Sequence, residues 1–185
     1  IQTDIFRLSP KDLATLYEYW CFLALHHLLS KKYKVIKNDL IQINDRGLYV
    51  TLNRAANSKV IYRNPQTGER FELAYNPLFK NGVGNQQPDH VLSLHKKGSQ
   101  TTYKFVFDAK YRINPAIPGS DYARKYGLPG PEEDDINTMH RYRDAIIAQD
   151  YSEDMNGLHY QRLLYGAYVL FPYRDEETYR QHPFY

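Results

Sequence analysis

The sequence predicts an α/β protein that forms a single domain. One long helical segment lies before a series of short apolar strands, and another lies after most of them. Turn-rich loops join most of these strands in pairs. The length of 185 residues suits one domain with a sizeable core, and 42% hydrophobic with 24% charged residues is ordinary for a globular protein. Because the first residue is Ile1 rather than methionine, residues 1–185 are expected to be one domain excised from a longer protein.

The first helix has a clear start signal and one unusual acid. Ser9 suits the N-cap, and Pro10 suits the first turn. Residues 13–29 are apolar on nearly every side, which predicts a largely buried helix. Glu18 is the one charged residue inside this run, and a buried carboxylate is costly unless it is paired, protonated or bound to a metal. Glu18 is therefore either a helix-edge glutamate that reaches solvent or a lysine, or an acid of a metal site.

The rest of the chain alternates between strands, turns and one more long helix. Six strand-like segments form three expected hairpins, which pair 40–43 with 48–52, 60–63 with 70–75, and 89–95 with 101–110. A second helix is expected from about Ile136 to Gln149, after a run of acids, and a last strand at 163–171. Two segments are expected without regular structure, a flexible loop at 113–133 and a charged, aromatic tail at 173–185.

The third hairpin carries the residues of chemical interest. It brings Asp89 towards Asp108 and Lys110, and strand alternation puts Asp108, Lys110 and Val106 on one face. Two carboxylates can hold a divalent cation, and an ammonium group can orient water or stabilise negative charge. This combination is what metal-dependent phosphodiester cleavage requires. The alternative is a weak surface ion pair at a strand end.

Composition and charge narrow the classes of function. The net charge of +3 permits nucleic-acid binding without requiring it, and each lysine or arginine cluster taken alone also fits a solvated face. The lone Cys21 excludes a disulfide framework and a cysteine zinc site, and it suits a reduced, cytoplasmic setting. The sequence contains neither an apolar run of membrane-spanning length nor a signal-peptide pattern, so no membrane partner is expected.

Four blocks in this order resemble the PD-(D/E)XK nuclease superfamily, and more narrowly its branch of McrBC-related restriction system components. The blocks are YEYW at 17–20, FDAKYR at 107–112, DINTMHRYRDA at 135–145 and YVLFP at 168–172. The resemblance spans residues 13–172. It implies a restriction-endonuclease-like α/β fold, in which helices flank a mixed central sheet of about four or five strands. The segment 40–75 would be an inserted or extended β-hairpin region.

The resemblance also implies roles for single residues. Asp89 and Asp108 would bind Mg²⁺, or Mn²⁺ in its place, together with the carbonyl oxygen of Ala109. Lys110 would orient the attacking water, and Glu18 would be a supplementary metal ligand or a supporting acid in the catalytic set. The residues expected to contact nucleic acid are Tyr142, Arg143, Arg112, Arg124 and Lys125. A structural role is equally open for Tyr142.

The function implied by the resemblance is metal-dependent DNA cleavage in a restriction or defence system. Two alternatives remain open, a non-catalytic DNA-binding or assembly module with the same fold, and an RNA-directed nuclease. In related systems the nuclease works with an AAA+ NTPase motor that translocates DNA, and this sequence has no phosphate-loop motif of its own. Cleavage of both strands would need two active sites, which favours a homodimer or a larger complex.

Overall fold

The computed structural model describes residues 10–43, 50–52, 59–80, 84–99, 101–152, 157–162 and 164–181. Among these residues there are four helices and ten strands. The helices are α1 (Pro10–Lys32), α2 (Asp121–Tyr126), α3 (Glu133–Ala145) and α4 (Glu176–Arg180). The strands are β1 (Lys34–Asn38), β2 (Ile41–Ile43), β3 (Val50–Leu52), β4 (Lys59–Arg63), β5 (Arg70–Tyr75), β6 (His90–His95), β7 (Thr102–Ala109), β8 (Ile147–Ser152), β9 (Gly157–Arg162) and β10 (Leu164–Leu170).

A six-stranded mixed sheet forms the centre of the fold, in the order β1-β4-β5-β6-β7-β10. Neighbouring strands are antiparallel except for β10, which runs parallel to β7. A parallel pair needs a long crossover, and the chain between β7 and β10 provides it with α2, α3 and the β8–β9 pair. The predicted α/β class with a mixed central sheet is confirmed.

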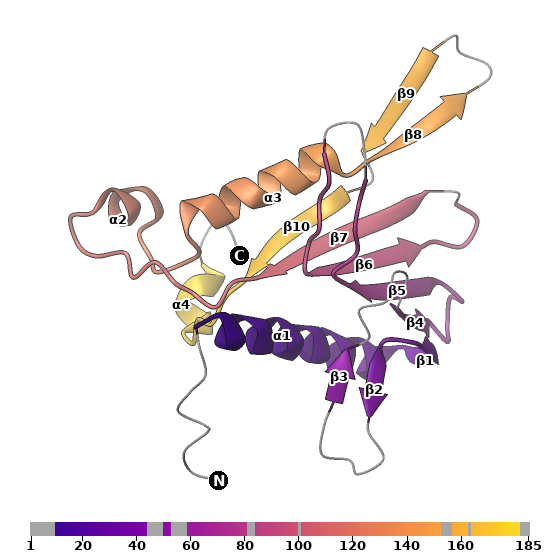
Figure 1. The fold of residues 1–185 in the computed structure, drawn as a ribbon, viewed down its shortest axis with the longest axis horizontal. Coiled ribbons are helices and arrows are strands. Elements are labelled where there is room, and N and C mark those ends of the chain that lie inside the picture. The colour runs from indigo at the N-terminus through magenta and orange to yellow at the C-terminus, as the bar shows by residue number, and fades with distance from the viewer. Residues whose placement is uncertain are drawn as a thin grey trace.

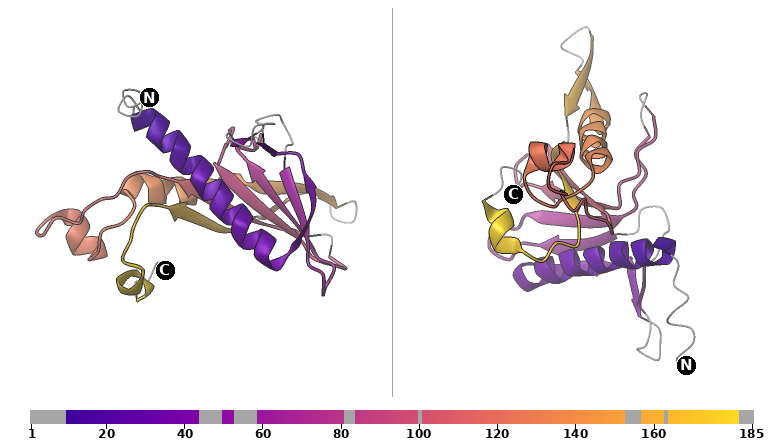
Figure 2. Two further views of the ribbon diagram at one scale, coloured as in Figure 1. Left: turned by 90° about the horizontal axis from the view of Figure 1, so that it is seen from below. Right: turned by 90° about the vertical axis from the view of Figure 1, so that its left-hand side faces the viewer.

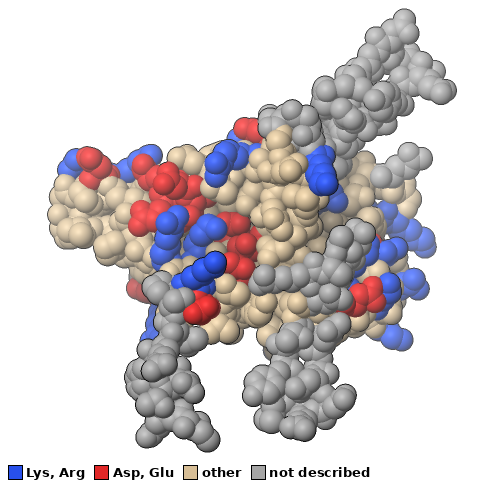
Figure 3. Space-filling model, in the orientation of Figure 1, with Lys and Arg blue, Asp and Glu red and all other residues tan. Residues whose placement is uncertain are grey.

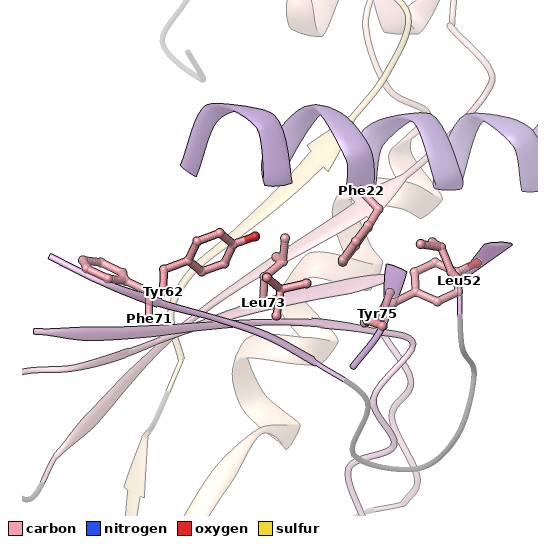
Figure 4. Close-up of a cluster of buried hydrophobic side chains, with 8 residues drawn as sticks. Phe22, Leu52, Tyr62, Phe71, Leu73 and Tyr75 are labelled. Carbon is pink, nitrogen blue, oxygen red and sulfur yellow. The ribbon is translucent and has the colours of Figure 1, made fainter. Parts of the chain in front are cut away.

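Helices α1 and α3 lie on opposite faces of this sheet (Figures 1 and 2). Under α1, Phe22 packs with Tyr62, Leu73 and Tyr75 of β4 and β5 (Figure 4). On the other face, the buried residues of α3 pack against the strands on that side of the sheet; this second core contains Val91, Val106, Met139, Tyr142, Ile146 and Leu164. Each helix therefore covers only part of its face of the sheet.

The three predicted hairpins are present as antiparallel pairs, β2–β3, β4–β5 and β6–β7. β1 and the β4–β5 hairpin extend the central sheet, whereas β2–β3 forms a sheet of its own. The turn predicted at residues 44–47 lies outside the described residues. The additional strands explain why the sheet has six strands rather than the four or five that the resemblance implied.

The second long helix is shifted relative to its prediction. It runs from Glu133 to Ala145, because the acids expected before it form its first turn. The prediction that the helix continues to Gln149 is wrong: the backbone leaves the helix at Ile146, and strand β8 begins at Ile147. The sequence analysis also missed β1, β8, β9 and the two short helices α2 and α4.

The segment 113–133, expected as a flexible loop, contains helix α2 and closes on itself. Asn114 and Gly130 exchange backbone hydrogen bonds of 2.7 and 3.1 Å, and the Tyr122 hydroxyl donates to the Pro131 carbonyl at 2.7 Å. The Ser120 side chain caps α2. The segment 173–185 likewise contains α4, whose Tyr179 packs against the ring of Phe171.

Helix α1 begins at Pro10 as predicted, and its expected N-cap Ser9 lies outside the described residues. The prediction that it is largely buried is wrong. Cys21 and Phe22 are buried, but Trp20 is 62% exposed and Leu16 is 51% exposed. The physical reason is that the sheet covers one side of α1, so the apolar residues on its other side remain exposed. Within the described part of the chain, no helix has the length and apolar character needed to cross a membrane.

Candidate active site

Asp89 and Asp108 face each other where β6 begins and β7 ends. The antiparallel register pairs His90 with Phe107, so the next pair outwards is Asp89 with Asp108, and directly opposed residues share a face. The Ala109 backbone N–H donates to Asp89 Oδ2 at 2.7 Å, which holds the first carboxylate against β7. Asp108 is 2% exposed. The hairpin therefore builds a pair of adjacent carboxylates from two strand ends, with Asp108 buried and Asp89 half-buried.

Lys110 turns back onto this pair. Its Nζ lies 2.5 Å from Asp108 Oδ2, which confirms that the two side chains share a face. The Lys110 backbone N–H donates to the Leu170 carbonyl of β10 at 2.8 Å, so the parallel strand fixes the residue. Burial would lower the pKa of Lys110, but the contact with Asp108 raises it above its ordinary value, and the side chain stays protonated.

Tyr142 of α3 supports Asp108 from the other side. Its hydroxyl donates to Asp108 Oδ1 at 3.2 Å, and its ring is buried in the core under α3. Burial, together with the charges of Asp108 and Asp89, raises the pKa of Tyr142, so the hydroxyl remains a donor. Of the two roles that the sequence left open for Tyr142, this contact fits the structural one, because a buried ring holds the carboxylate in place.

The charge on the carboxylate pair is incompletely compensated. Burial, the adjacent charge of Asp108 and the more distant Glu18 raise the pKa of Asp89 from 3.8 to about 7, against the opposing effects of the Ala109 N–H and Lys110. Asp108 Oδ2 has Lys110 at ion-pair distance, yet this buried oxygen accepts no hydrogen bond of good geometry. The site therefore has unused capacity for a cation.

Glu18 lies beside the pair rather than in it. Its Oε2 accepts a hydrogen bond of 3.0 Å from the Tyr75 hydroxyl, and its charge contributes to the raised pKa of Asp89. No group of three or more His, Cys, Asp and Glu side chains within the described ranges has the geometry to hold a metal ion. In this arrangement Glu18 is a neighbouring acid, and its role as a third ligand remains a prediction.

The two aspartates fit a hard divalent cation. Carboxylate and carbonyl oxygens are the donors that Mg²⁺ and Mn²⁺ prefer, and Mg²⁺ is commonly held by one or two protein carboxylates plus water and substrate phosphate. Asp89 and Asp108 would supply the carboxylates, and the carbonyl oxygen of Ala109, between Asp108 and Lys110, could add a third donor. A carboxyl pKa that is raised by a neighbouring carboxylate, as that of Asp89 is, is typical of functional sites.

Comparison with known proteins agrees with this geometry. Residues 15–176 match a protein family described as the PD-(D/E)XK nuclease superfamily. The chain belongs to the PD-(D/E)XK nuclease superfamily. A curated relative, a pyrethroid hydrolase from Klebsiella sp, is 24% identical over 153 residues, which are 73% of this chain and 22% of that protein. This chain thus matches only about a fifth of the relative's length. No solved structure gives a match.

The basic residues predicted to contact nucleic acid in this PD-(D/E)XK domain are mostly paired with acids. Each of the four has an acidic neighbour. Arg112 lies 2.6 Å from Asp135, and Lys125 lies 2.8 Å from Glu133. Arg143 lies 3.9 Å from Asp144, and Arg124 is in contact with Asp121. Acidic and basic side chains are accordingly intermixed over α2, the start of α3 and the end of β7 (Figure 3). These four basic residues therefore attract the phosphate backbone of a nucleic acid less than four unpaired cations would.

A basic surface that the sequence analysis did not identify lies on the face of the sheet shared with Asp108. Its members come from three strands that the sheet register aligns; we call Lys59, Arg63, Arg70 and Lys104 the cationic face. Glu72 lies among them and pairs with Lys59 at 2.5 Å and with Arg70. The signal in the sequence was the alternation of charged and apolar residues in β4 and β5, but only the strand register brings these charges together.

Proposed function

We propose that this PD-(D/E)XK chain is a metal-dependent DNA endonuclease domain that hydrolyses phosphodiester bonds. The observation that carries the proposal is the adjacent pair of half-buried Asp89 and buried Asp108, with Lys110 at 2.5 Å from Asp108 and a raised pKa at Asp89. A bound Mg²⁺ or Mn²⁺ would lower the pKa of a water molecule and neutralise charge on the scissile phosphate. An acid pair without a metal would leave this negative charge uncompensated next to an anionic substrate.

The chain's own residues then divide the remaining work. Lys110, held protonated by Asp108, can orient the attacking water and stabilise the negative charge that develops on the phosphate. Tyr142 and the Ala109 N–H fix one oxygen of each carboxylate, at 3.2 and 2.7 Å, so the ligand positions are set before substrate arrives. Glu18 would tune the charge of Asp89 or join the site as a supplementary ligand.

We also propose a wider setting for the domain, a restriction or defence system in which it acts with an AAA+ NTPase motor. The four sequence blocks similar to McrBC-related components support this setting. Double-strand cleavage would use two copies of the site, in a homodimer or a larger complex. RNA cleavage and a non-catalytic assembly role are the competing functions.

A plasmid-nicking assay tests the proposed function. The purified domain, alone and with a motor partner, should convert supercoiled DNA to nicked or linear forms in Mg²⁺ or Mn²⁺ but not in EDTA. A parallel incubation with RNA of equal length separates the RNA-directed alternative. Metal-independent cutting, or intact DNA under every metal condition, would remove the support for this function.

The cationic face leads to a prediction about DNA binding. Its Lys104 precedes Asp108 by four residues on β7, or about 13 Å along the strand, so one bound stretch of DNA can reach both. Replacement of Arg63 and Arg70 together by alanine is expected to lower DNA affinity about 10-fold at low salt and to reduce the salt dependence of binding by about two ion equivalents. Fluorescence anisotropy at several salt concentrations measures both quantities.

The double variant Arg124→Ala with Lys125→Ala is the matched control, because it removes the same charge from the predicted contact residues on α2. Arg124 and Lys125 each have an acid of their own, whereas Lys59 and Arg70 of the cationic face share Glu72, so the control is expected to bind DNA almost as the wild type does. A larger loss in the α2 variant than in the variant of the cationic face would instead favour the contacts predicted from the sequence.

A further inference from the structure

A row of three aromatic rings lies beside the candidate active site and has no part in the chemistry proposed above. Tyr17 of α1 stacks on Trp20, with ring centroids 5.8 Å apart and planes at 16°. Tyr17 also meets Tyr111 at a centroid distance of 5.4 Å. Trp20 is 62% and Tyr111 is 51% exposed. We call these three residues the aromatic row, and more than half of the surface of each outer residue, Trp20 and Tyr111, is exposed to solvent.

Two separate segments connect the aromatic row to the site. Tyr111 directly follows Lys110, and Tyr17 directly precedes Glu18 on α1. Cys21 lies one helical turn after Tyr17 and is close enough to Asp89 to feel its charge. Burial raises the pKa of Cys21 to about 11, a hydrogen bond with Tyr17 lowers it, and the charge of Asp89 adds to the increase. A phosphate bound at the carboxylate pair would therefore place its neighbouring nucleotide close to Tyr111.

The kind of surface points to nucleotide bases. Aromatic side chains bind single strands by stacking on bases, and every base offers a flat π-face. Tyr111 directly follows Lys110, whose Nζ lies 2.5 Å from Asp108 Oδ2, so the aromatic row adjoins a site suited to a phosphodiester. In an intact duplex the bases stack on one another, so only unpaired or extruded bases can reach a protein ring.

We propose that the aromatic row stacks unpaired bases of the substrate next to the scissile phosphate. The preferred substrate is then single-stranded DNA, or DNA with unpaired nucleotides at the cleavage position, rather than an uninterrupted duplex. This inference rests on the proposed function, because it specifies the substrate class of that same site. A protein partner on the row is the competing occupant.

Trp20 provides a direct probe, since it is the one tryptophan in the 185 residues. The experiment titrates the domain in EDTA with a dT oligonucleotide and with a duplex of equal length, following tryptophan fluorescence and the anisotropy of a labelled strand. The expected result is quenching by the single strand and binding at least about 10-fold tighter than to the duplex.

Variants assign the effect to the rings. Trp20→Leu and Tyr111→Leu are each expected to weaken single-strand binding by about 5- to 100-fold, while Trp20→Phe keeps most of the affinity because a ring remains. Leu28→Ala is the matched control, since Leu28 is an equally exposed apolar residue of α1, more than two turns beyond Trp20. Its affinity should equal that of the wild type.

The outcomes separate this inference from the function on which it rests. Equal binding of single strand and duplex without quenching overturns the inference, even if DNA cleavage is normal. Single-strand quenching in a domain that cuts no DNA with Mg²⁺ or Mn²⁺ supports the aromatic row and overturns the nuclease function. A concentration-dependent shift of Trp20 fluorescence without DNA assigns the row to a protein contact and overturns the inference.

Discussion

Asp108→Asn and Lys110→Ala are each expected to lower the rate of DNA cleavage at least about 100-fold while leaving the fold intact. Asparagine keeps the shape of Asp108 and its contact with Tyr142 but removes the charge that would hold a metal. Alanine at Lys110 removes the ammonium group at 2.5 Å from that carboxylate. Single-turnover rates in Mg²⁺, with thermal melting of each variant, measure activity and fold separately.

Asp135→Asn is the control for the cleavage prediction. Asp135 is also a buried carboxylate in an ion pair, with Arg112 at 2.6 Å, but it lies in the first turn of α3 and outside the carboxylate pair. Its variant should lose stability and keep near-normal cleavage per folded molecule. Normal cutting by Asp108→Asn, or an equal loss in both variants, would show that the site has been assigned to the wrong residues.

Asp89→Asn is expected to stabilise the metal-free domain at pH 8 by about 2–4 kcal/mol, which corresponds to roughly 4–16 °C in Tm. The reason is that burial and the charge of Asp108 raise the pKa of Asp89 from 3.8 to about 7. Above that pH the folded protein contains a carboxylate whose charge it disfavours, and the amide removes this cost. Stabilisation by loss of a functional group is the usual trade-off at an active site.

The pH dependence of this gain has a defined sign. With a folded pKa above the unfolded value, the folded state binds more protons, so the Asp89 contribution destabilises the wild type as pH rises from about 4 to about 7. The advantage of Asp89→Asn should be absent below about pH 4, grow through this window and stay constant above it. Urea unfolding across pH 4–8 measures it.

Mg²⁺ and a second variant complete the stability test. Saturating Mg²⁺ should raise the Tm of the wild type at pH 8 but not that of Asp89→Asn, because binding to the folded state stabilises it only where the ligand is intact. Asp135→Asn should lose stability at the same pH, since its carboxylate is already compensated by Arg112. Loss of stability in Asp89→Asn at every pH from 4 to 8 would contradict the claim that the ionised Asp89 carboxylate destabilises the folded protein.

The sequence was sufficient to predict the local geometry of the site. Alternation along β7 put Asp108 and Lys110 on one face, and the hairpin register placed Asp89 opposite Asp108. Both features depend on residues within about twenty positions of each other, where turn chemistry and strand period determine the structure. The residues also predicted α3 and the last strand, and the resemblance to nucleases implied the mixed sheet in which β10 runs parallel to β7; the family match supports that relationship.

Long-range pairing was what the sequence could not predict. The apolar composition of α1 predicted burial, but only the packed structure shows that the sheet covers one side and leaves Trp20 exposed. The pairing of Arg112 with Asp135 crosses 23 positions, so the positive charge of Arg112 looked free. Charged residues spread over β4, β5 and β7 formed no recognisable run, although the sheet register collects them into the cationic face.

The central claim is that Asp89 and Asp108 hold the metal ion of a nuclease, and the position of bound Mn²⁺ tests it most directly. Anomalous diffraction from crystals grown with Mn²⁺ should locate an ion within about 2.0–2.6 Å of an oxygen from each carboxylate, with Lys110 displaced from Asp108 Oδ2. An ion bound elsewhere, or an unchanged Lys110–Asp108 pair at saturating Mn²⁺, would contradict the account.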